Sequence, residues 1–275
     1  MNRLSLEKRT QIVGMLVEGN SLRATSRLAG VSINTVTKLL VEVGTACAEY
    51  HDKHVRGIKS KRVQCDEIWS FVYSKQKNVP DEMKGSYGVG DVWTWTAIDA
   101  DSKLIVSYLV GLRNAECANV FMQDVASRLV YRVQLTTDGL KAYLDATVEA
   151  FQGNVDYAQL VKMYGNTPGG AGRYSPAECT GIKKEPMIGN PTERHISTSF
   201  VERQNLTMRM NMRRFTRLTN AFSKKVENHE LAIALHFMYY NFVRIHKTLR
   251  VTPAQASGIT TKLWDIEDLV KLANS

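Results

Sequence analysis

The spacing of apolar residues along this 275-residue chain first changes near residue 62. Before that point they recur every three or four residues, as on one face of a helix. After it come runs rich in β-branched and aromatic residues, which favour strands. Such a chain is expected to place a small all-α unit ahead of a larger α/β unit. The hydrophobic content of 44% is enough for one sizeable core and a small satellite domain.

Three helices are expected within the first fifty residues. Each begins at a serine that can cap it, and two of them end at glycines. The caps are Ser5, Ser21 and Ser32, and the glycines are Gly19 and Gly30. We therefore predict helices over residues 6–17 and 22–29, and a third that starts at residue 33.

The tight turn Gly30-Val31-Ser32 between the second and third helices is typical of a helix-turn-helix. The third helix would then be the recognition helix, and we predict an all-α DNA-binding domain over residues 1–50. A generic three-helix bundle is the alternative. The net charge of +9 fits a polyanionic partner but also fits many unrelated basic proteins. The residues expected to face DNA are Asn34, Thr35, Thr37 and Lys38.

A polar and basic linker is expected over residues 51–62, before an α/β domain over residues 63–254. Its pattern predicts three strands, a helix, a strand and a helix, with the second and third strands joined as an antiparallel hairpin by residues 100–103. The expected elements are the strands 62–73, 92–99, 104–110 and 132–137 and the helices 115–129 and 140–151.

Glycine and proline are frequent over residues 153–192, so no regular element is expected there, and the segment is interpreted as an insertion. Helical spacing resumes over residues 199–213. Residues 222–242 are apolar nearly all round, which predicts a buried helix. Residues 255–275 are expected to be a C-terminal tail.

Neither a secretory signal segment nor a membrane span is apparent, so a cytoplasmic location without membrane partners is expected. The four cysteines lie far apart and contain no Cys-x-x-Cys pair. This spacing favours reduced, inert thiols over a disulfide framework or a zinc ribbon.

Carboxylates occur where strands normally bury apolar side chains. Asp66 and Glu67 lie within the first strand, where alternation directs them to opposite faces, and Asp138 follows the fourth strand. Glu202 lies early in the helix 199–213. At 100° per residue it shares one stripe with Asn205, Arg209 and Arg213, which are candidates for holding DNA phosphate.

Two aspartates and a glutamate suit two-metal phosphoryl transfer. Hard oxygen ligands hold two Mg²⁺ ions ~4 Å apart, one at the nucleophile and one at the leaving oxygen. Each carboxylate alone could also have a purely structural role, such as a strand-end cap or a surface charge. The combination of Asp66, Asp138 and Glu202 in this order carries the prediction.

The same order resembles the DDE transposases, which share an RNase H-like fold. More narrowly, several segments resemble the insertion-sequence-one family and its single-frame relatives. These segments are Cys65-Asp66-Glu67-Ile68-Trp69, Asp91-Val92-Trp93-Thr94-Trp95, Leu135-Thr136-Thr137-Asp138-Gly139 and the block from His195 to Pro253.

The resemblance implies a transposase that binds the terminal inverted repeats of an element and joins the freed 3′-hydroxyl to target DNA, with no covalent protein intermediate. It implies Asp66, Asp138 and Glu202 as ligands of two Mg²⁺ ions, with Mn²⁺ as a substitute. It also implies a homodimer or larger assembly on double-stranded DNA, associated with the nucleoid of a bacterium or archaeon.

The chain departs from that family in two ways. It lacks the zinc-binding module that often precedes the helix-turn-helix. Sixty-four residues separate Asp138 from Glu202, a longer gap than in the best-known members, which the insertion at 153–192 would explain.

Other interpretations stay open on the sequence alone. Glu67 would replace Asp66 as a ligand if the strand register were shifted by one residue. His195 is a secondary candidate for a metal or the scissile phosphate, although a cap or surface role is more common for such a histidine. A tyrosine recombinase using Tyr239 or Tyr240 is one rival, and a regulatory helix-turn-helix protein without activity is another.

Overall fold

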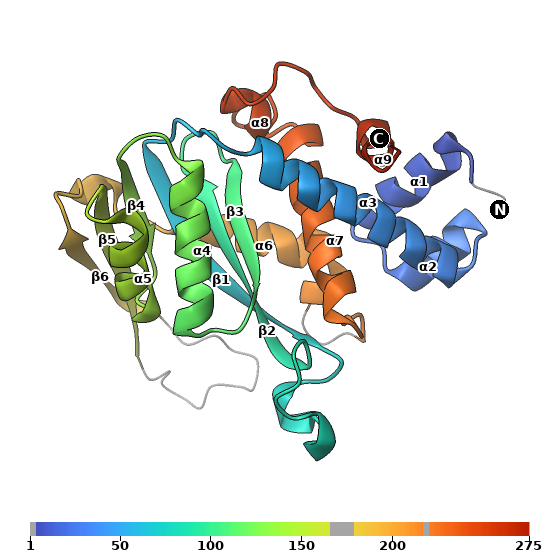
Figure 1. Ribbon diagram of the computed structural model, residues 1–275, viewed down its shortest axis with the longest axis horizontal. Helices are drawn as coiled ribbons and strands as arrows, with labels where there is room; N and C mark the ends of the chain where they lie inside the picture. The colour runs from blue at the N-terminus through green and yellow to red at the C-terminus, as the bar shows by residue number, and fades with distance from the viewer. Residues whose placement is uncertain (1–3, 166–178, 217–219, 275) are drawn as a thin grey trace.

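A twisted six-stranded sheet is the centre of the molecule (Figure 1). The computed structural model describes residues 4–165, 179–216 and 220–274. Within them the strand order is β3-β2-β1-β4-β5-β6. The central strands β1, β4 and β5 are parallel, and the outer pairings are antiparallel. The strands are β1 (Arg62–Val72), β2 (Gly90–Asp99), β3 (Ile105–Gly111), β4 (Val133–Thr137), β5 (Val155–Tyr164) and β6 (Cys179–Ile188).

Helices cover both faces of this sheet (Figure 1). On one face lie α4 (Ala115–Arg128) and α5 (Ala142–Phe151). On the other lies α6 (Ser199–Asn211), and after it comes α7 (Val226–Met238), which continues as a π-helical turn over Tyr239–Val243. This mixed α/β architecture matches the expected fold class and is compatible with an RNase H-like fold.

The three N-terminal helices begin where the serine caps predict. They are α1 (Leu6–Val17), α2 (Leu22–Ala29) and α3 (Ile33–His54). Each serine hydroxyl accepts a hydrogen bond from the backbone N–H three residues on, which satisfies one of the free donors at a helix start. Gly30 ends α2 in the left-handed conformation, with φ +64°.

These helices do not form a separate core. One continuous hydrophobic cluster runs from α1 and α3 through the sheet to α7. The expected linker at 51–62 begins as the last turn of α3, and His51 is buried there. Likewise, the expected tail includes α9 (Ile266–Leu272), which packs on α1 and α3, after the short α8 (Pro253–Ala256).

Gly44 permits the close approach of α3 and α7. A Cβ atom at this position would lie 2.7 Å from the backbone oxygen of Leu231 on α7. We expect Gly44→Leu to lower the free energy of unfolding by about 2 kcal/mol, because overpacking outweighs the gain in helix propensity. Urea denaturation measures this. The matched control is Thr45→Leu on the exposed side of α3, and an equal loss in both variants would contradict the close packing.

Three expectations from the sequence were wrong. Residues 153–192 include the strands β5 and β6, which pair antiparallel, although residues 166–178 of this segment lie outside the described residues. Residues 255–275, expected to be a tail, contain a helix, α9, that packs on α1 and α3. The helix expected to reach Arg213 ends at Asn211. Among the described residues, no helix is both long and apolar enough to cross a bilayer.

Candidate metal centre

The two aspartates meet because β1 and β4 are parallel neighbours. Their register pairs Gln64 with Thr136, so two residues further on Asp66 lies level with Asp138. Strand β4 ends at Thr137, and the ladder between the two strands opens at this point. The aspartates therefore lie where two adjacent strands separate, which is where ligands gather in α/β sheets.

Glu67 joins them. One carboxylate oxygen from each of Asp66, Glu67 and Asp138 lies within 4.8 Å of the other two. Asp66 and Glu67 do face opposite sides of the sheet, since Asp66 contacts Asn205 of α6 and Glu67 contacts Tyr143 of α5. The pairing of β1 with β4 ends at Gln64, so beyond it the edge of β1 that faces Asp138 is open to both carboxylates. A shift of register is not needed to bring Glu67 to this cluster.

Asp66 is held from two sides. Its Oδ1 accepts from the backbone N–H of Glu67 at 2.9 Å, and its Oδ2 accepts from the side-chain amide of Asn205 at 2.8 Å. Asn205 is buried, and its own Oδ1 has no hydrogen-bond partner. This placement favours a role for Asn205 in positioning Asp66 over the predicted contact with DNA.

Arg113, which the sequence did not single out, is the cation of this cluster. Its Nε lies 2.5 Å from Oε1 of Glu67, and its second terminal nitrogen lies 3.5 Å from Oδ2 of Asp138. The guanidinium also lies over the ring of Trp93, 5.0 Å from its centroid. The side chain of Glu67 is only 1% exposed, and Tyr143 donates to its other oxygen at 3.0 Å.

Glu202 lies near the cluster but is held apart from it. Its carboxylate is not among the three that lie within 4.8 Å of one another in the described structure. Lys162 of β5 approaches Oε2 at 2.5 Å, and the hydroxyl of Thr198 donates to Oε1. The charge of Glu202 nevertheless acts on Asp66 and Asp138, where it raises the pKa of each carboxyl.

Burial and mutual repulsion make these acids hard to ionise. Burial raises the pKa of Asp66 to about 7, and the charges of Glu67 and Asp138 add to this. Burial is also the first cause of the raised pKa of Asp138 and of Glu67. A cluster with this excess of negative charge fits a bound cation, because a cation would remove the repulsion.

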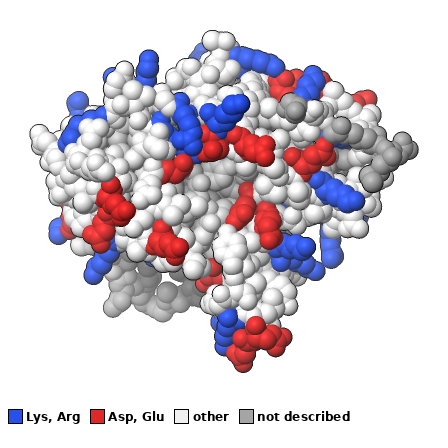
Figure 2. Space-filling model, in the orientation of Figure 1, with Lys and Arg blue, Asp and Glu red and all other residues white. Residues whose placement is uncertain are grey.

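The donor set fits a hard divalent ion. It consists of carboxylate oxygens, with the unpartnered amide oxygen of Asn205 beside them. Figure 2 shows acidic side chains gathered around a hollow in the middle of one face, with basic side chains above it. The described part of this face carries no continuous basic surface.

The predicted DNA contacts differ in exposure. Asn34, Lys38, Arg209 and Arg213 are exposed. Thr35 and Thr37 are half-buried, and their hydroxyls bond to Ser32 and to the backbone oxygen of Ile33. All these residues stay predictions for DNA contact.

His195 is not brought to the carboxylates. It contacts Arg62 at the start of β1, four residues before Asp66, which corresponds to about 13 Å along the strand. The hydroxyl of Tyr239 donates to Glu18, and Tyr240 is buried. Tyr240 is therefore not accessible as a nucleophile, and the hydroxyl of Tyr239 is bonded to a carboxylate at α1, which disfavours the tyrosine recombinase.

Comparison with known proteins gives weak likenesses. The sequence matches no protein-family model and no curated protein. Among solved structures, a Mos1 transposase paired-end complex with the left transposon end is 13% identical, with a TM-score of 0.25 over 57% of this chain and 60% of that one. A piggyBac transposase synaptic complex with hairpin DNA is 10% identical, with a TM-score of 0.41 over 98% and 69%. The Mos1 strand transfer complex is 12% identical, with a TM-score of 0.26 over 86% and 78%. The chain thus spans less than two thirds of the first of these, and at such identities and scores the likeness establishes neither its family nor its activity.

Proposed function

We propose that this protein is a DDE transposase of RNase H-like fold that cleaves DNA at the ends of an element and joins them to target DNA. The observation that carries the proposal is the meeting of Asp66 and Asp138 at the point where β1 and β4 separate. Glu202 lies on α6, the helix that packs over Asp66, and its negative charge raises the pKa of Asp66. This order of three carboxylates is the one that the sequence resemblance implies.

Asp66, Asp138 and Glu202 would hold two divalent ions, with Mg²⁺ the expected ion and Mn²⁺ a substitute. Divalent ions held by these residues would supply Lewis-acid activation of the attacking water or hydroxyl and charge stabilisation for the leaving oxygen. The protein's own residues position the ligands. Asn205 orients Asp66, and Lys162 pairs with Glu202.

The N-terminal helices would bind the terminal repeats through α3, with Asn34 and Lys38 as the most exposed of its predicted contacts. Arg209 and Arg213 lie on or just beyond α6 and would hold DNA phosphates near the cluster. A homodimer or larger assembly on DNA follows from the need to join two ends. A regulatory protein without activity is the second candidate, but the three carboxylates are all present.

Metal binding should depend on pH. Asp66, with a pKa of about 7 in the metal-free protein, must lose its proton to bind a cation. We expect the apparent Mn²⁺ affinity to fall by up to about tenfold for each pH unit below 7, with proton release on binding. Calorimetry in buffers of different ionisation enthalpy measures both quantities. An affinity that is equal at pH 6 and pH 8 would contradict this arrangement.

The raised pKa of Asp66 also affects the free energy of unfolding. The folded-state pKa of Asp66 lies above its unfolded value of 3.8, so ionisation favours the unfolded chain. The metal-free protein should therefore lose stability as the pH rises from about 4 to about 7, and added metal should offset the loss.

The direct test of the proposal is cleavage and joining of labelled DNA that carries the element's ends. The reaction is compared with Mg²⁺ and with EDTA, for the wild type and for variants of the three carboxylates. Activity that survives EDTA would remove the metal mechanism.

A further inference from the structure

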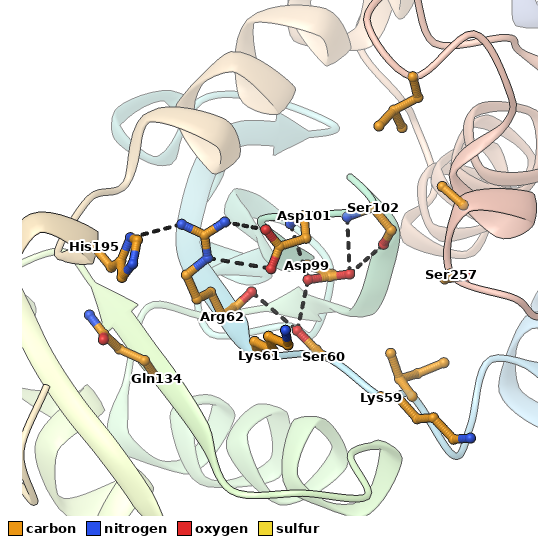
Figure 3. A pocket seen from close by; sticks show the side chains of 13 residues that line it. Lys59, Ser60, Lys61, Arg62, Asp99, Asp101, Ser102, Gln134, His195 and Ser257 are labelled. Carbon is orange, nitrogen blue, oxygen red and sulfur yellow. Dashed lines mark hydrogen bonds and ion pairs between the residues drawn. The ribbon is translucent and has the colours of Figure 1, made fainter. Parts of the chain in front are cut away.

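A second charged site lies at the start of β1, four residues before Asp66. A hollow of about 700 Å³ opens beside the start of β1 and the turn after β2, and a smaller one of about 200 Å³ adjoins it. Figure 3 shows the side chains that line the larger hollow. We define the basic groove by five residues around the two hollows: Lys59, Lys61, Arg62, Arg194 and His195.

The acids of this region are already neutralised or fully bonded. Asp99 accepts from the hydroxyls of Ser60 and Ser102 and from two backbone N–H groups, so it holds the turn after β2. Asp101 forms an ion pair with Arg62, as Figure 3 shows. Within the described part of the chain, Lys59, Lys61 and Arg194 form no direct ion pair, although the charge of Lys61 acts on Asp101. The groove therefore keeps an excess of positive charge.

Two guanidinium groups of this groove face the ring of His195, which cannot accept a hydrogen bond from both. Its Nδ1 lies 2.9 Å from a terminal nitrogen of Arg62, and its Nε2 lies 3.2 Å from Nε of Arg194. Both contacts require the ring to accept, and an imidazolium ring accepts at neither nitrogen. A neutral imidazole accepts at one nitrogen only. One of the two guanidinium N–H groups must therefore find its acceptor elsewhere.

We propose that the basic groove binds the phosphodiester backbone of DNA, as a site distinct from the carboxylate cluster and from α3. An anionic oxygen supplies the missing acceptor, and guanidinium groups suit phosphate geometry. The cations come from the segment before β1 and from the segment before α6. Figure 3 shows Lys59, Lys61 and Arg62 spread along the hollow toward His195 instead of converging on one point. A line of cations fits a polyanion better than a single phosphate.

This inference rests on the proposed function, because it assigns DNA as the ligand. The groove begins about 13 Å from Asp66 along β1, so DNA held there lies outside the reacting bonds. Its role is to hold a flanking stretch of duplex, and it is not part of the chemistry.

The test is the salt dependence of DNA binding in EDTA, measured by fluorescence anisotropy with a labelled duplex. The variant combines Lys61→Gln and Arg194→Gln, which are both exposed. Each lost phosphate contact should lower the slope of log K against log salt by about 1. The matched control combines Lys77→Gln and Lys84→Gln in the connection between β1 and β2, which removes the same charge, and it should keep the wild-type slope.

The outcomes separate the two proposals. A groove variant with the wild-type or control slope overturns the groove, even where wild-type protein cleaves DNA with Mg²⁺. A reduced slope in the groove variant alone supports it, even where no cleavage is found. Calorimetry with inorganic phosphate is the second arm. Binding of inorganic phosphate as tight as that of the duplex would make the groove a small-anion site and overturn the assignment to DNA.

Discussion

Replacing Asp66 by asparagine should abolish strand cleavage and joining, with a loss of about 10³-fold or more in rate. Asparagine keeps the size of the side chain and can still bond to the backbone N–H of Glu67. It removes the charge that a divalent cation requires. The measurement is product formation from labelled DNA with Mg²⁺, together with Mn²⁺ binding by calorimetry.

Asp138→Asn and Glu202→Gln should behave in the same way, because each removes one proposed ligand. DNA binding should persist in all three, since α3 and the basic groove are distant from the change. The control is Asp81→Asn, at a surface carboxylate that pairs only with the exposed Lys84. Full activity of Asp66→Asn, or metal binding that is unchanged in it, would remove the proposed centre.

Replacing Arg113 by alanine should lower the free energy of unfolding of the metal-free protein by about 3 kcal/mol at pH 8. The change leaves Glu67 buried without its cation, beside two other acids. The loss should shrink at lower pH, because protonation of Glu67 removes the uncompensated charge. Urea denaturation at pH 5 and pH 8 measures the difference.

Two comparisons test the reason for that loss. Adding Mn²⁺ should restore part of the stability of Arg113→Ala, since a bound cation replaces the guanidinium charge. The double variant Glu67→Gln with Arg113→Met should be more stable than Arg113→Ala alone, because neither charge is then left buried. A loss that is independent of pH and of metal would assign Arg113 to packing on Trp93 instead.

Local signals in the sequence were sufficient for much of the fold. The serines Ser5, Ser21 and Ser32 fixed the starts of three helices because a cap is a contact between near neighbours in the chain. The turn after β2 predicted the antiparallel hairpin of β2 and β3, at the edge of the sheet, for the same reason. The strands β5 and β6 were missed because the glycines and prolines of 153–192 outweighed the β-branched and aromatic residues over 155–164.

The candidate site was predictable in part. Asp66 and Asp138 could be found because acids at strand positions are unusual, and the structure brings them together. Arg113 and Lys162 could not be predicted. Each contacts an acid that lies on another element, and the strand order that brings them together is not encoded by any local pattern. The distance between Glu202 and the two aspartates could not be predicted either, because it depends on the ion pair between Glu202 and Lys162.

The helix α3 is continuous over 22 residues. It spans about 33 Å from the end that would read bases to the end before β1, and it packs on α7. If α3 binds the terminal repeat, the length of the helix sets the distance between the recognised bases and the cleaved bond. When a few base pairs are inserted between the recognised bases and the cleaved bond, the protein should not reorient to reach the original bond. Cleavage should instead stay at a constant distance from the recognised sequence.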